Sequence, residues 1–179
     1  LGDALLLTGD VKGSREHQSR ALELRTELVA QDPLDMRVGR DLSVSHNKLA
    51  DLDTRQGHAE DAHTHYAAAL AETRRLASFD PGNPQWKREQ AVGLMNLGHA
   101  SQVLGRHDEA RREFEESLAI SRGLIERNAD DVQARRDMAQ AHYLFANLML
   151  GAGDLAEARK DYPRSCEIRP GLAGAGAQN

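Results

Sequence analysis

Residues 97–114 read LGHASQVLGRHDEARREF, and together with residues 49–66, LADLDTRQGHAEDAHTHY, they decide the fold. Each stretch has a glycine at its ninth position, Gly57 or Gly105, and an alanine five residues later. Each ends on an aromatic ring, Tyr66 or Phe114. The second stretch begins 48 residues after the first, which indicates an internal repeat.

The same offset extends outward through most of the 179 residues. Positions related by it include Gly9, Gly57, Gly105 and Gly153; Asp35, Asn83 and Asp131; and Ala62, Ala110 and Ala158. A register kept without insertion through nearly four copies is typical of a protein whose units stack on one another.

Each copy divides into two helices of roughly 20 residues. The first helix opens at Asp35, Asn83 or Asp131, whose side-chain oxygen can accept the free amide hydrogens of a first turn. It ends at the repeated glycine, because glycine tolerates the left-handed conformation of helix ends. The second helix carries one apolar face from Ala110 through Phe114 and onward.

We therefore predict an all-α fold, an α-α superhelix of about 3.7 helix-turn-helix units with roughly eight antiparallel helices. The array is expected at residues 1–169, followed by a flexible tail at 170–179. Its copies are expected at 1–34 (partial), 35–82, 83–130 and 131–169 (truncated).

The fourth copy departs from the pattern at two positions. Pro163 stands inside the second helix, where the other copies have Glu115 and Ala67, and it removes one helical hydrogen bond. We expect a kinked or frayed helix around residues 162–169. Cys166 aligns with Leu118 and Leu70, which favours a small buried apolar role over that of a nucleophile.

The central copies resemble the tetratricopeptide repeat, because Leu97-Gly98, Gly105, Ala110 and Phe114 lie at the spacing of that family. The common unit of that family has 34 residues, whereas the unit here has 48. In this respect the chain looks like the long-repeat arrays of large bacterial multidomain proteins. The resemblance implies a right-handed superhelix whose first helices line a concave groove for a peptide or a partner helix.

Composition narrows the partners and the compartment. The net charge is −5 with both signs interleaved, so no basic stripe predicts binding to nucleic acid. No apolar run approaches the ~20 residues that cross a membrane. The single cysteine favours the reducing cytoplasm. Leu1-Gly2-Asp3 lacks an initiator methionine, so we expect a fragment of a longer protein.

The sequence offers no constellation for catalysis, and no catalytic residue, metal or cofactor is predicted. His63 and His65 are two apart on a helix and point about 200° apart, so they cannot share a metal. A two-ligand site near His58, or from Asp61 with His65, stays open, but solvated titratable side chains are the favoured interpretation.

The expected function is a protein–protein interaction scaffold. The alternative is a structural spacer or a self-association arm that stacks through the open ends of the solenoid; an enzyme site in this segment is the least favoured. Repeat positions on the first helices give the groove candidates Asn47, Asp51, Arg55, Met95, His99, Gln102, Tyr143 and Asn147. Among them, the amides of Asn47 and Asn147 offer both a donor and an acceptor to a peptide backbone.

Overall fold

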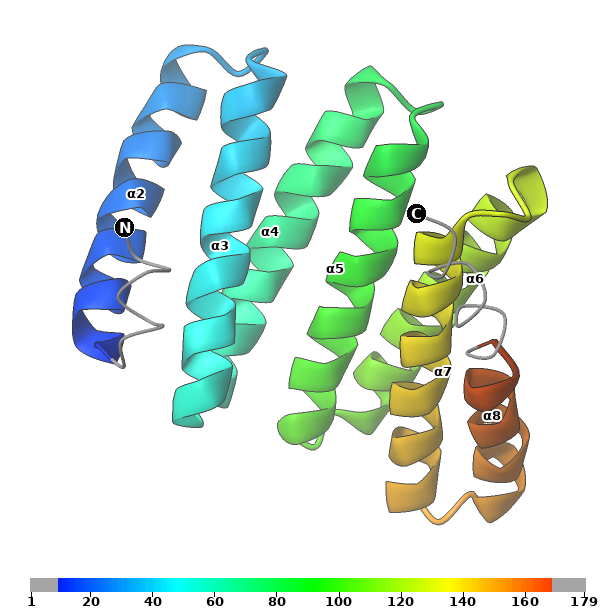
Figure 1. The fold of residues 1–179 in the computed structure, drawn as a ribbon. Coiled ribbons are helices and arrows are strands. Elements are labelled where there is room, and N and C mark those ends of the chain that lie inside the picture. Colours follow the sequence, from blue (N-terminus) through cyan, green and yellow to red (C-terminus); the bar gives the residue numbers. More distant parts are fainter. Residues whose placement is uncertain (1–9, 169–179) are drawn as a thin grey trace. The chain divides into compact units, whose positions relative to one another are not determined.

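A computed structural model describes residues 10–168 of the chain. This range contains seven helices and no strand (Figure 1). The helices are α2 (Val11–Gln31), α3 (Met36–Gln56), α4 (Ala59–Phe79), α5 (Pro84–Val103), α6 (His107–Arg127), α7 (Val132–Gly151) and α8 (Leu155–Ile168). The all-α class is confirmed, whereas the helix expected at the start of the chain and the expected tail lie outside the described residues.

The predicted helix starts and ends are confirmed. Asp35 accepts hydrogen bonds from two backbone amides of α3 at 3.0 Å, and Asp131 does the same for α7 at 3.0 and 2.9 Å. The first helices of the second, third and fourth copies end beside Gly57, Gly105 and Gly153, whose φ angles are 78°, 73° and 80°. A side chain at such a φ would be strained, so glycine is required at these turns.

The chain divides into two compact bodies at residue 82, where the second sequence copy ends. The N-terminal body holds α2, α3 and α4, and the C-terminal body holds α5 to α8. In the C-terminal body one apolar cluster joins three helices. Its buried members are Ala110, Phe114, Leu118, Ala141, Phe145, Leu148, Met149 and Ala158.

Small side chains let the two helices of a copy approach closely. A Cβ added to Gly98 on α5 would lie 3.1 Å from the ring of Phe114 on α6, which is itself fully buried. Farther along the same pairs, hydroxyl groups bond to the backbone of the partner helix. Ser117 donates to the Ala91 carbonyl at 2.7 Å, and Ser43 donates to the Ala69 carbonyl at 3.2 Å.

Two expectations for the last helix are corrected. First, α8 continues through Pro163 to Ile168, so the fraying expected around residues 162–169 is wrong as far as residue 168, whereas the alternative of a kink at the proline stays a prediction. Second, Cys166 is exposed, although Leu118 and Leu70 at the equivalent positions are buried. Leu118 is covered by α7 of the following copy, whereas no helix after α8 lies in the described range to cover Cys166.

Substitution at Pro163 tests how much strain α8 carries. Because proline removes a hydrogen bond and crowds the preceding turn, Pro163→Ala should raise the free energy of unfolding by up to about 3 kcal/mol. The reciprocal change at the equivalent position of α4, Ala67→Pro, should lower it by a similar amount. Urea denaturation followed by circular dichroism measures both. An unchanged midpoint for Pro163→Ala would show that the helix accommodates the proline without cost.

Candidate functional site

The groove candidates of the N-terminal body lie on α3. Asn47 is half-buried, and its side-chain oxygen accepts no hydrogen bond from residues 10–168. Asp51 is exposed and accepts a hydrogen bond of 2.6 Å from the Tyr66 hydroxyl of α4. Burial, and then this hydrogen bond, raise the pKa of Tyr66 well above its usual value, so the phenol stays protonated and donates. Arg55 is exposed at the end of the helix.

The other five candidates lie in the C-terminal body. Three of them, Met95, His99 and Gln102, are half-buried on α5. On α7, Tyr143 is 41% exposed, and its ring meets that of Tyr162 edge-on with centroids 6.2 Å apart. The Tyr162 hydroxyl donates to the Asn147 side-chain oxygen at 2.6 Å.

Two of the groove candidates, Asp51 and Asn147, therefore use a side-chain oxygen for a hydrogen bond within the protein. Asp51 and Asn147 occupy the same repeat position, and each accepts from the tyrosine at the same position of the second helix. In the third copy the partners are His99 and Phe114, and the phenylalanine has no hydroxyl to donate. The sequence alignment contained this pairing, but only the fold shows that the two positions touch.

An ion pair holds α5 beside α7 in the C-terminal body. The Arg88 guanidinium donates to both carboxylate oxygens of Asp137, at 2.7 and 3.5 Å. Both side chains are partly buried. Because equivalent residues recur 48 apart, Met95 and Tyr143 occupy the same position of neighbouring first helices, as do His99 and Asn147. We call the face formed by these four residues with Gln102 and Leu150 the α5–α7 face.

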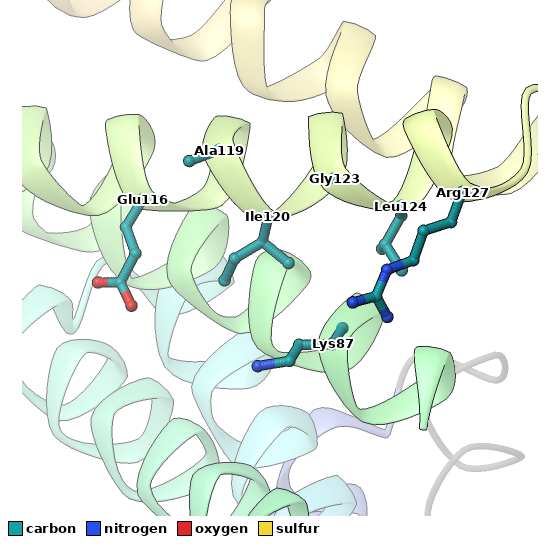
Figure 2. Close-up of a pocket in the computed structure, with 7 residues that line it drawn as sticks. All are labelled: Lys87, Glu116, Ala119, Ile120, Gly123, Leu124 and Arg127. Atoms are coloured by element: carbon teal, nitrogen blue, oxygen red, sulfur yellow. The ribbon is translucent and has the colours of Figure 1, made fainter. Parts of the chain in front are cut away.

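A cavity of about 340 Å³ opens elsewhere in the C-terminal body, between α5 and α6. Figure 2 shows Ile120, Leu124 and Arg127 of α6 pointing toward Lys87 of α5. The hollow includes Gly123, where an added Cβ would meet nothing within 4 Å. The preceding copy has Arg75 at this position, so the exchange of a long side chain for glycine is the signal that could have located the cavity.

Titratable side chains gather where α3 turns into α4. Asp53, His58 and Asp61 each offer a ligand atom within 4.8 Å of the others'. His65 adds an imidazole nitrogen 3.9 Å from Asp53, and its other ring nitrogen lies 3.1 Å from that of His46. Sequence spacing suggested His58, Asp61 and His65 but missed Asp53, because that residue belongs to the other helix of the hairpin.

A second titratable pair is enclosed in the C-terminal body. The His142 Nδ1 atom lies 2.8 Å from an Asp161 oxygen, and the two side chains are 3% and 2% exposed. Burial lowers the pKa of His142 below 6.5, although the hydrogen bond to Asp161 acts in the opposite direction. At neutral pH the ring is therefore neutral, and its Nδ1–H donates to the carboxylate.

Paired helices, left-handed glycine turns and a constant register define this chain as an α-α helical repeat protein. Residues 91–128 match the model of a tetratricopeptide repeat family. The fold is thus of the tetratricopeptide-repeat type, as the sequence resemblance indicated. No curated protein matches its sequence. Helical repeats of this type are generally non-enzymatic and mediate protein–protein interactions. No helix among residues 10–168 has the length and hydropathy to span a membrane.

Comparison with solved structures gives matches of low sequence identity, of which the first shares the fold. BtubC (BKLC) from P. vanneervenii is 21% identical with a TM-score of 0.66; the match covers 92% of this chain and 59% of that one. A MamA structure described as MSR-1 C2 is 20% identical with a TM-score of 0.48, covering 94% of this chain and 72% of that one. Another crystal structure of MamA is 18% identical with a TM-score of 0.38, covering 97% of both chains.

The His142–Asp161 pair predicts a pH dependence of stability. The unfolded chain takes up a proton on this histidine near pH 6.5, whereas the folded state resists it because its pKa is lowered. The contribution to stability is complete above pH 6.5 and is lost as the pH falls through that value toward the folded pKa. We expect a lower urea midpoint at pH 5.5 than at pH 7.5.

The variant His142→Gln supplies the control, since its amide can donate to Asp161 but does not titrate. Its midpoint should fall less between the two pH values. An identical fall in the variant and the parent would assign the pH dependence to other groups.

Proposed function

We propose that this chain is a protein-interaction scaffold that binds an extended peptide or a partner helix through the α5–α7 face. The observation that carries the proposal is the exposure of large apolar side chains there. Tyr143 and Leu150 on α7 are 41% and 49% exposed, and they stand seven residues apart on one side of the helix. Apolar groups exposed together at a repeat surface are typical of a site that a partner covers.

The neighbouring side chains suit the recognition of a peptide. Met95 packs on the core cluster from α5, and its flexible thioether adapts to differing partner surfaces. Tyr143 combines a large apolar ring with a polar tip. His99 and Gln102 add polar groups to the same face. The mixture favours an apolar anchor with polar contacts beside it, which is the usual anatomy of a protein interface.

The fixed positions of α5, α7 and the Tyr143 ring also support the proposal. The Arg88–Asp137 pair fixes α5 beside α7, and the edge-on contact with Tyr162 restrains the Tyr143 ring. A side chain that is already ordered loses less entropy when a partner binds. Tyr143 is therefore the residue that we expect to contribute most to affinity.

Selection from a random peptide library displayed on phage, against the full chain, tests the proposal. Peptides recovered on the parent should bind Tyr143→Ala and Leu150→Ala at least about tenfold more weakly, as for other interface anchors. Leu34→Ala, which removes an exposed apolar side chain from a turn of the N-terminal body, should bind them unchanged. Peptides that bind all three variants equally would exclude this face.

A self-association arm is the second candidate function, and the exposure of Cys166 favours it. The two equivalent leucines are buried, so this side of α8 offers a position that another helix could cover. Sedimentation velocity over a range of concentrations distinguishes the candidates. A dimer that Cys166→Glu dissociates would support self-association, whereas a monomer at all concentrations would exclude it.

A further inference from the structure

The hairpin between α3 and α4 brings three possible metal ligands together, Asp53, His58 and Asp61, and places an imidazole nitrogen of His65 3.9 Å from Asp53. Gly57 turns the chain, so Asp53 in the last turn of α3 faces the start of α4. His58 is the residue that precedes α4, and Asp61 and His65 are four apart within it, so the latter two share one side of the helix. His58 and Asp61 are exposed, whereas the Asp53 side chain is completely buried.

The Asp53 carboxylate is only half satisfied. Its Oδ1 atom accepts a hydrogen bond from the Arg15 guanidinium of α2. Its Oδ2 atom is buried and accepts none from residues 10–168. The Nε2 atom of His65 lies 3.9 Å from this oxygen, which is beyond hydrogen-bond distance. A buried carboxylate oxygen without a donor is costly, and a bound cation would offset that cost.

The third copy shows how a polar pair at this position is satisfied without an ion. Ser101 stands where Asp53 does, and Glu113 stands where His65 does. The Ser101 hydroxyl donates directly to Glu113 at 2.7 Å, so that pair closes without an ion. In the second copy the equivalent pair is held 3.9 Å apart. Two ligands of one Zn²⁺ in a tetrahedral site stand about 3.4 Å apart, so the wider spacing leaves room for an ion.

We propose that Asp53, His58, Asp61 and His65 bind a divalent transition-metal ion of the Zn²⁺ type. Two imidazole nitrogens with two carboxylates suit Zn²⁺, whereas Mg²⁺ and Ca²⁺ prefer oxygen ligands alone. His58 Nδ1 lies 3.9 Å from Oδ1 of Asp53, which Arg15 also bonds, and His65 Nε2 lies 3.9 Å from Oδ2, so an imidazole nitrogen stands near each carboxylate oxygen. The sequence-based prediction of no metal site is replaced by this proposal, because the fold adds a buried carboxylate to the exposed ligands.

Residues behind the ligands complete the site. The Nδ1 atoms of His46 and His65 are 3.1 Å apart, so one of them donates to the other. When His65 donates, its Nε2 atom is bare and faces Asp53. The Arg15 guanidinium donates to the Oδ1 atom of Asp53 and so orients that carboxylate. Such outer partners orient metal ligands and are part of most metal sites in proteins.

The site belongs to the second copy alone. The third copy has Ser101, Arg106, Glu109 and Glu113 at the four positions, and the fourth has Met149, Asp154, Glu157 and Asp161. Neither set contains a histidine. Because Asp53 also contacts α2 through Arg15, a bound ion would link the last turn of α3 to α2 and to the start of α4, and so stabilise the N-terminal body.

Isothermal titration of the chelator-treated full chain with Zn²⁺ tests the proposal. We expect one ion per chain, and a higher melting temperature in its presence because the ion binds the folded state. His58→Ala and Asp61→Ala change exposed side chains, and each should weaken binding by at least about tenfold. Substitution of Co²⁺ should give the visible absorption of a four-coordinate site, and His58→Ala should reduce it.

His107→Ala is the matched control, because it removes an exposed histidine from the first turn of α6. It should bind Zn²⁺ as the parent does. Asp53→Ser, which introduces the residue of the third copy, should fold and fail to bind. The proposal is overturned if the parent shows no saturable binding. It is equally overturned if His58→Ala and Asp61→Ala bind normally, or if His107→Ala weakens binding as much as they do.

Discussion

The close approach of the two helices within each copy is the constraint on which the rest of the structure depends. At Gly98 an added Cβ would lie 3.1 Å from the buried ring of Phe114, so the ring would have to shift by a few tenths of an ångström to admit it. Ala50 and Ala146 occupy the same position in the neighbouring copies and are completely buried. Larger side chains there would separate the helices, and the hydroxyl-to-carbonyl bonds of Ser43 and Ser117 would be lost.

Tight pairing also encloses polar side chains between the helices, and each copy satisfies them differently. The third copy uses a direct bond between Ser101 and Glu113. The fourth uses a neutral histidine, His142, which donates to a carboxylate. The second places an aspartate where the third has serine, and its free oxygen is the basis of the proposed metal site. One backbone thus supports three chemistries, because a repeat fixes positions and leaves side chains free to vary.

The faces of the first helices that lie outside these pairs are where we propose that a partner binds. In the C-terminal body, Arg88 and Asp137 hold two first helices together, so that equivalent residues form parallel rows. The exposed ring of Tyr143 lies in one row and is restrained from behind by Tyr162. The metal site and the proposed partner face belong to different bodies, so the tests of one leave the other unaffected.

The sequence by itself determined the repeat length, the helix starts at Asp35, Asn83 and Asp131, and the glycine turns, because these depend on local backbone chemistry. It also placed the groove candidates on the first helices. The continuity of α8 through Pro163, the exposure of Cys166 and the use of Asn147 as an acceptor for Tyr162 were decided by tertiary packing. The approach of Asp53 to His58 was decided in the same way. Periodicity gives the side of a helix on which a residue lies, but only packing decides which helix covers that side and which polar atom is left without a partner.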